Sequence, residues 1–233
     1  MEKIISKAGH ISIPVVIGSG GLLSMWLIAY LLQNGMLPLW VISQHKIVNF
    51  TLTMQIMVLP ISFIALALLY IYNRESFKKF FRIAIDKENN WNFYGPIMAV
   101  AFTIGTLLLM SVDVMSQNGS INNSFFAMMP LVLFVSATNA WSEEIFSRFV
   151  IVAGLDGKLK PVTICWISGV IFGIPHYFFG TPSGLFGVVM SGMLGWLLAK
   201  SVIETRGLGW ALFIHFLQDV VIFGSGAMII AGH

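Results

Sequence analysis

The sequence predicts an all-α protein, a polytopic transmembrane helix bundle of about seven or eight spans forming one integral membrane domain over residues 1–233. Of these 233 residues, 57% are hydrophobic and only 10% are Asp, Glu, Lys or Arg, whereas a soluble globular domain carries about 25% charged residues. A bilayer-spanning helix needs roughly 20 mainly apolar residues. The chain therefore has room for seven or eight spans but for no sizeable water-soluble domain.

Seven apolar segments can be distinguished along the chain. The first follows basic residues as in a signal peptide, but its apolar run is too long and no small-residue cleavage pattern follows it, so we expect a retained helix. The fourth would be about 46 Å long as one helix and must tilt, kink or project from the membrane. The segments run over about Ile13–Gln33, Ile47–Tyr72, Tyr94–Met115, Ser124–Gly154, Val162–Phe179, Gly184–Ile203 and Leu208–Ala231.

The Lys and Arg residues predict the orientation in the cell membrane, because basic residues collect in cytoplasmic loops. With a cytoplasmic N-terminus, 11 of the 13 basic residues fall inside, Lys46 falls outside and Arg148 lies within a span. This alternation favours an odd number of spans. The basic segment 73–92 is predicted to be either an amphipathic helix on the inner leaflet or an ordinary cytoplasmic loop.

The charge argues against a nucleic-acid partner, and the cysteine content excludes an internal disulfide. The net charge of +3 and the pI of about 9.1 are explained by orientation charges, so we expect no nucleic-acid partner. The single cysteine, Cys165, cannot form an internal disulfide, and its apolar surroundings are typical of a small buried hydrophobe.

A small set of polar residues lies in the later spans, where lipid should exclude them. Each charge at mid-membrane costs about 2.5–3.5 kcal/mol, so these groups must be paired, protonated or hydrated. Their number favours an intramembrane active site over packing alone, although a lone histidine often makes only a helix–helix hydrogen bond. The set comprises Glu143, Glu144 and Arg148 in WSEEIFSR, His176 in IFGIPHY, and His215 with Asp219 in FIHFLQD.

Helical geometry separates the two adjacent glutamates. Glu144 and Arg148 are four residues apart and share a face, which permits an ion pair and indicates a structural role. Glu143 is turned about 100° away and has no partner on its own helix, so it is a candidate general base. His215 and Asp219 also share a face, so the aspartate can orient the imidazole or share a water with it. Depths along ideal helices allow these groups to converge in one layer.

The spacing of these residues resembles a known family. WSEEIFSR fits EExxxR, Phe172 to His176 fits FxxxH, and His215 to Asp219 fits HxxxN/D, in this order on successive apolar segments. This pattern is similar to the CAAX protease and bacteriocin-processing family of intramembrane endopeptidases, which includes the type II CAAX prenyl endopeptidases. The resemblance covers a catalytic core of about 142–220, and the first three spans match only by hydropathy.

The resemblance implies that Glu143 and His176 activate a water that attacks the scissile carbonyl. It also implies that His215 and Asp219 stabilise the oxyanion or complete the site, and that Arg148 holds Glu144. The implied partners are the lipid bilayer and a peptide or lipidated protein substrate, while the oligomeric state is not predicted. Two residues depart from the family pattern: Phe149 stands where many members have glycine, and Asp219 stands where the prenyl endopeptidases have asparagine.

The cofactor is left open by the sequence. Glu143, His176 and His215 are candidate ligands for a divalent metal such as zinc, since a Glu and two His match a catalytic zinc set in residue type. No HExxH motif occurs, and a metal-free water activated by glutamate is equally compatible.

Other functions fit parts of this pattern. A serine protease has little support, because glycine–serine runs in membrane helices usually serve packing. A protease that uses Cys165 has little support either. The alternative from another class is a proton-coupled transporter or a non-catalytic membrane module, including one with a role in bacteriocin immunity.

Overall fold

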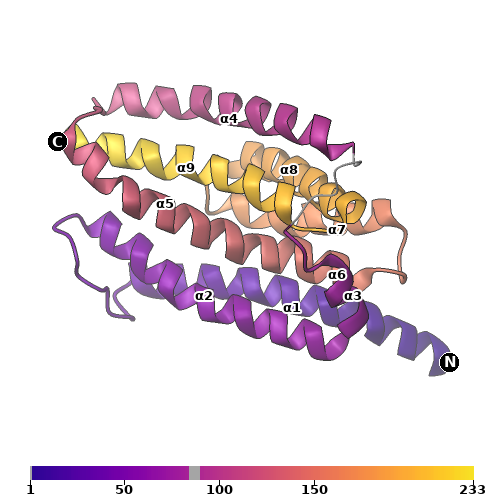
Figure 1. Cartoon of the computed structure of the whole chain (residues 1–233). Coiled ribbons are helices and arrows are strands. Elements are labelled where there is room, and N and C mark those ends of the chain that lie inside the picture. The colour runs from indigo at the N-terminus through magenta and orange to yellow at the C-terminus, as the bar shows by residue number, and fades with distance from the viewer. Residues whose placement is uncertain (1, 84–89) are drawn as a thin grey trace.

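A computed structural model describes residues 2–83 and 90–233 of the chain. Every element in this part is helical, which confirms the predicted polytopic helix bundle. Six helices are long and apolar enough to cross a membrane. They lie side by side along one direction, and α1 begins at the end of the bundle opposite to the end of α9 (Figure 1).

The six long helices agree closely with six of the seven predicted spans. The fourth predicted span is one 33-residue helical run over Asn123–Leu155, in which a π-helix, η1 (Ile145–Phe149), separates α5 from α6. The long helices are α1 (Glu2–Gln33), α2 (Lys46–Tyr72), α4 (Trp91–Ser116), α5 (Asn123–Glu144) with α6 (Val150–Leu155), α8 (Gly184–Thr205) and α9 (Gly209–Ala231).

The fifth predicted span, Val162–Phe179, is shorter than the others. It consists of α7 (Pro161–Gly173) followed by the 3₁₀ helix η2 (Ile174–Tyr177). Pro175 lacks the N–H that an α-helix would use at this position, and its ring clashes with the preceding turn. The α-helix therefore ends early, and His176 lies on the tighter 3₁₀ turn.

The basic segment 73–92 forms a helix only at its start. α3 (Arg74–Phe80) begins where the Asn73 side chain accepts a hydrogen bond from the Ser76 N–H, and residues 84–89 lie outside the described part of the chain. The rings of Phe77 and Phe81 pack on Phe149, with centroids 5.2 and 5.4 Å from it. This part of the segment is therefore packed against the protein, and its place on the inner leaflet stays a prediction.

Small residues bring α7 and α8 into close contact. A Cβ added to Gly169 would lie 2.6 Å from the carbonyl oxygen of Gly192, and one added to Gly173 would lie 2.7 Å from that of Val188. Backbones approach this closely in membranes only where side chains are absent. This contact holds the end of α7, and with it the turn that carries His176, against α8.

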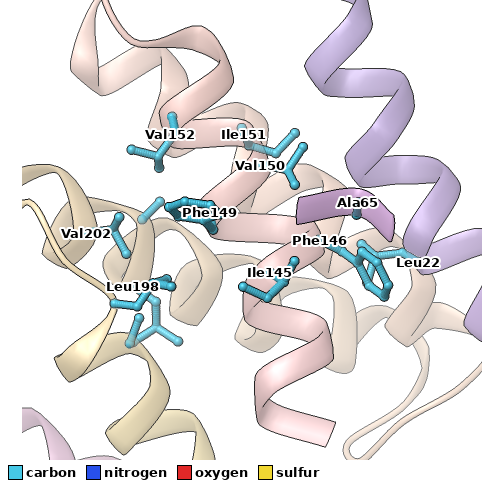
Figure 2. Packing of buried hydrophobic residues seen from close by; sticks show 14 of the residues in the cluster. Leu22, Ala65, Ile145, Phe146, Phe149, Val150, Ile151, Val152, Leu198 and Val202 are labelled. Carbon is cyan, nitrogen blue, oxygen red and sulfur yellow. The ribbon is translucent and has the colours of Figure 1, made fainter. Parts of the chain in front are cut away.

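The core surrounds the π-helix and α6. Ile145, Phe146, Phe149, Val150 and Ile151 are fully buried, and Figure 2 shows them among side chains of α1, α2 and α8. Because a fully buried residue is fixed by many neighbours, the segment directly after the two glutamates is anchored on several sides.

Candidate active site

The two glutamates lie where α5 passes into the π-helix η1. The Val150 N–H bonds to the carbonyl of Ile145, five residues earlier, in place of the usual four. The Ser147 hydroxyl donates to the Glu143 carbonyl, and the Arg148 guanidinium donates to the Ser147 hydroxyl. Single π-turns inside α-helices occur frequently at functional sites. The geometry of an ideal helix, which the sequence-based expectation used, contains no such turn.

Glu144 and Arg148 form the ion pair that their spacing permits. Arg148 Nη2 lies 3.2 Å from Glu144 Oε1, and both side chains are completely buried. The guanidinium also lies over the Phe172 ring, with Cζ 3.8 Å from the ring centroid, an arrangement in which a cation is attracted by the ring face. Pairing and stacking together offset part of the loss of hydration of the two charges.

Glu144 has a second partner that the sequence did not indicate. Its Oε1 lies 2.6 Å from Nδ1 of His215, while Nε2 of the same ring lies 3.3 Å from Oε2 of Glu143. His215 on α9 is therefore held between the two adjacent glutamates. Because a carboxylate accepts hydrogen bonds, Nδ1 donates to Glu144 and the Nε2 edge faces Glu143.

Of the two interactions predicted for Asp219 and His215, a direct hydrogen bond is not formed. Asp219 Oδ1 lies 3.8 Å from His215 Nε2, beyond hydrogen-bonding distance, because the short bond to Glu144 holds the imidazole on its other side. Asp219 Oδ2 instead accepts a hydrogen bond of 3.2 Å from Asn139 Nδ2. At this distance, Asp219 and His215 can interact through a shared water or by charge attraction.

His176 is fixed by the backbone of its own turn. Its Nδ1 lies 3.0 Å from the Phe172 carbonyl oxygen, which can only accept, so Nδ1 carries the proton and Nε2 keeps its lone pair. The Phe172 ring lies between the two histidines, with centroids 4.9 Å from His176 and 5.6 Å from His215. Phe172 thus contacts Arg148 and both imidazoles.

One cavity brings the four proposed catalytic side chains together. Its volume is about 860 Å³, and Glu143, His176, His215 and Asp219 all line it. Most other lining residues are apolar and come from α1, α2, α4 and α8. Glu144 and Arg148 do not line it and lie fully buried.

Further polar residues of this cavity were missed by the sequence analysis. Asn139 lies one helical turn before Glu143, and Gln55 lies on α2; the Gln55 Nε2 donates a 2.9 Å hydrogen bond to Asn139 Oδ1. Gln218 on α9 accepts from the Thr106 hydroxyl of α4. An uncharged amide inside an apolar span was an available signal, because amides are also costly to leave unpaired in lipid.

The candidate metal ligands Glu143, His176 and His215 do not form a ligand set in this structure. Within residues 2–83 and 90–233, no group of three or more His, Cys, Asp or Glu side chains is arranged to hold a metal ion. Nδ1 and Nε2 of His215 lie 2.6 Å from Glu144 and 3.3 Å from Glu143. We therefore derive no chemical step through a metal.

The fold and the site define a class: multi-pass membrane proteins that enclose a glutamate–histidine cluster within a helix bundle. Comparison with known proteins adds a family resemblance over part of the chain. Residues 125–221 match the family model described as type II CAAX prenyl endopeptidase Rce1-like, which confirms the resemblance to the CAAX protease family and supports an intramembrane protease in general. No curated protein and no solved structure matches the chain. The matched segment contains Asn139 and all the predicted site residues, but not Gln55.

Proposed function

We propose that the protein is an intramembrane endopeptidase that hydrolyses a peptide bond of a membrane-associated substrate, such as a prenylated or leader-peptide-like chain. One observation carries the proposal: Glu143, His176, His215 and Asp219, from α5, η2 and α9, line the same cavity. The proposed catalytic core of about 142–220 falls within the family match.

Glu143 and His176 are the two residues proposed to activate the water. Glu143 reaches the cavity, and the Nε2 lone pair of His176 can accept a hydrogen bond from a water. Glu143 takes one proton from this water as its oxygen forms a bond to the carbonyl carbon. The same proton then passes to the departing amine when the carbon–nitrogen bond breaks, so that Glu143 returns to its starting state.

His215 is proposed to stabilise the negative charge that develops on the carbonyl oxygen. Its Nδ1 is fixed by Glu144 at 2.6 Å, so the imidazole is already oriented before substrate binds. A preorganised donor of this kind typically contributes about 10²–10³-fold in rate. Asp219, at 3.8 Å from Nε2, supports a positive charge on this ring, which is how an aspartate can serve where the related prenyl endopeptidases have asparagine.

The cavity supports the proposed substrate class. It has a volume of about 860 Å³, and most of its lining outside the catalytic group is apolar. Sites for apolar ligands combine such walls with a few convergent polar groups. A peptide that carries a lipid group or an apolar sequence fits this description better than a charged soluble peptide.

Mass spectrometry of membrane peptides from cells that carry the unaltered protein or Glu143→Gln tests the proposal. We expect the cleaved peptides to disappear in the variant, while an exposed control on α3, Glu75→Gln, leaves them unchanged. Unaltered cleavage by a folded Glu143→Gln protein would rule out this base. Loss of an ion flux without any change in peptides would instead favour the proton-coupled transporter.

A further inference from the structure

Gln55 on α2 carries a buried acceptor for which no internal partner is found. Its side chain is only 2% exposed, it lines the cavity, and its Oε1 has no hydrogen-bond partner among the residues that the structure describes. A buried carbonyl oxygen left unpaired costs about 1–3 kcal/mol. The oxygen itself is covered, so a bound chain must move the side chains around it to become its partner.

The direction of this amide is dictated by Asp219. The Asp219 carboxylate accepts from Asn139 Nδ2 at 3.2 Å, so the Asn139 oxygen must face Gln55. That oxygen accepts from Gln55 Nε2 at 2.9 Å, so the Gln55 oxygen must be the free end. An ionised Asp219 at one end of the chain thus places an acceptor at the other end. An asparagine at position 219 would not impose this direction, since its amide can be turned either way.

We propose that Gln55 is a substrate-binding residue whose Oε1 accepts a hydrogen bond from a backbone N–H of the bound peptide. The inference rests on the proposed peptidase function and extends it to a residue outside the family match. A peptide bound in this largely apolar cavity must find acceptors for its backbone N–H groups. Gln55 bonds to Asn139, and Asn139 bonds to Asp219. Gln55 therefore places the peptide backbone at a set distance from the catalytic group.

The test asks whether loss of Gln55 Oε1 and loss of one backbone N–H of the substrate have the same, non-additive effect on cleavage. The probe is a farnesylated peptide with a C-terminal CAAX sequence, together with esters in which one backbone N–H at a time, outside the scissile bond, is replaced by oxygen. We expect one ester to lower kcat/KM about 5- to 10-fold with the unaltered protein, as for loss of one hydrogen bond. Gln55→Met should lower kcat/KM for the all-amide peptide by a similar factor, mainly through KM, and should show no further loss with that ester.

Two additional variants make the outcome specific. Gln33→Met removes an exposed amide that also lines the cavity, on α1, and should leave the ester effect intact. Gln55→Asn withdraws the amide by one methylene and should reproduce the loss of coupling if Gln55→Met fails to fold.

Each result decides between the two proposals. Equal ester effects in the unaltered protein and in Gln55→Met, or no ester effect at any position, would overturn the role of Gln55 and assign its acceptor to water, while cleavage that depends on Glu143 would leave the peptidase function standing. Absence of any Glu143-dependent cleavage of the probe would contradict the proposed function itself, including the substrate class on which the inference depends.

Discussion

The Oε1 atom of Glu144 lies 2.6 Å from Nδ1 of His215, although the two residues are 71 positions apart in the chain. The same oxygen faces Arg148 at 3.2 Å, so one buried carboxylate both neutralises a guanidinium and fixes an imidazole of the proposed site. Glu143, the preceding residue, faces the cavity. Adjacent glutamates therefore have different surroundings, and their substitution should have different consequences.

The first prediction concerns the two glutamates. Glu144→Gln removes the charge that pairs with buried Arg148, and loss of one partner of a buried ion pair typically destabilises by about 3–5 kcal/mol. Glu143→Gln leaves that pair in place and should abolish cleavage with little loss of stability. Thermal unfolding in detergent and cleavage of the farnesylated peptide measure the two effects. Equal thermal destabilisation by both substitutions would contradict the division.

The second prediction concerns Arg148, which both pairs with Glu144 and stacks on Phe172. Arg148→Met should destabilise the protein by about 3–5 kcal/mol, because Glu144 is left buried without its cation. Arg148→Lys restores the charge without the planar stacking, so it should recover stability only in part. An exposed arginine on α3 gives a control: Arg74→Met should change the unfolding temperature little. Full recovery by lysine would show that the stacking on Phe172 is unimportant.

The third prediction concerns Gly180, which follows the turn of His176. Its φ is +103°, and an added Cβ would lie 3.1 Å from His176 Nε2, the nitrogen that we propose to hold the water. Gly180→Ala should therefore lower kcat more than 10-fold by crowding that atom. Gly35→Ala is the matched control, since Gly35 also has a positive φ, of +69°, but has nothing within 4 Å of the added carbon. A similar fall in activity with both variants would trace the effect to backbone strain.

The fourth prediction concerns the contact between α7 and α8. Gly173→Ala would place a methyl group 2.7 Å from the Val188 carbonyl oxygen, and such overpacking of backbone typically costs about 1–3 kcal/mol. Separation of the helices should also displace His176, three residues further on, so both the unfolding temperature and the cleavage rate should fall. Gly20→Ala on α1 meets open space and lies outside the cavity, so it should leave both unchanged. An unaltered cleavage rate in Gly173→Ala would show that this contact does not position the histidine.

Segments and motifs were largely predictable from the sequence, because both depend on local properties. Hydropathy identified the six long helices to within a few residues, and the spacing of Glu144 and Arg148 predicted their ion pair. The cytoplasmic N-terminus and the roles of the site residues stay predictions. Hydropathy did not predict that the fifth segment changes from α-helix to 3₁₀ helix near Pro175.

By itself, the sequence determined that the chain is a helical membrane protein and which few polar residues its apolar spans must accommodate, because burial in lipid penalises every unpaired charge whatever the fold. Only the tertiary structure decided which groups meet. It contains a π-turn after Glu144. His215 bonds to Glu144, and Asp219 bonds to Asn139. Gln55 bonds to Asn139, which lies 84 residues further along the chain. These pairings join different helices, and their geometry follows from how the helices pack, which no spacing within a single helix encodes.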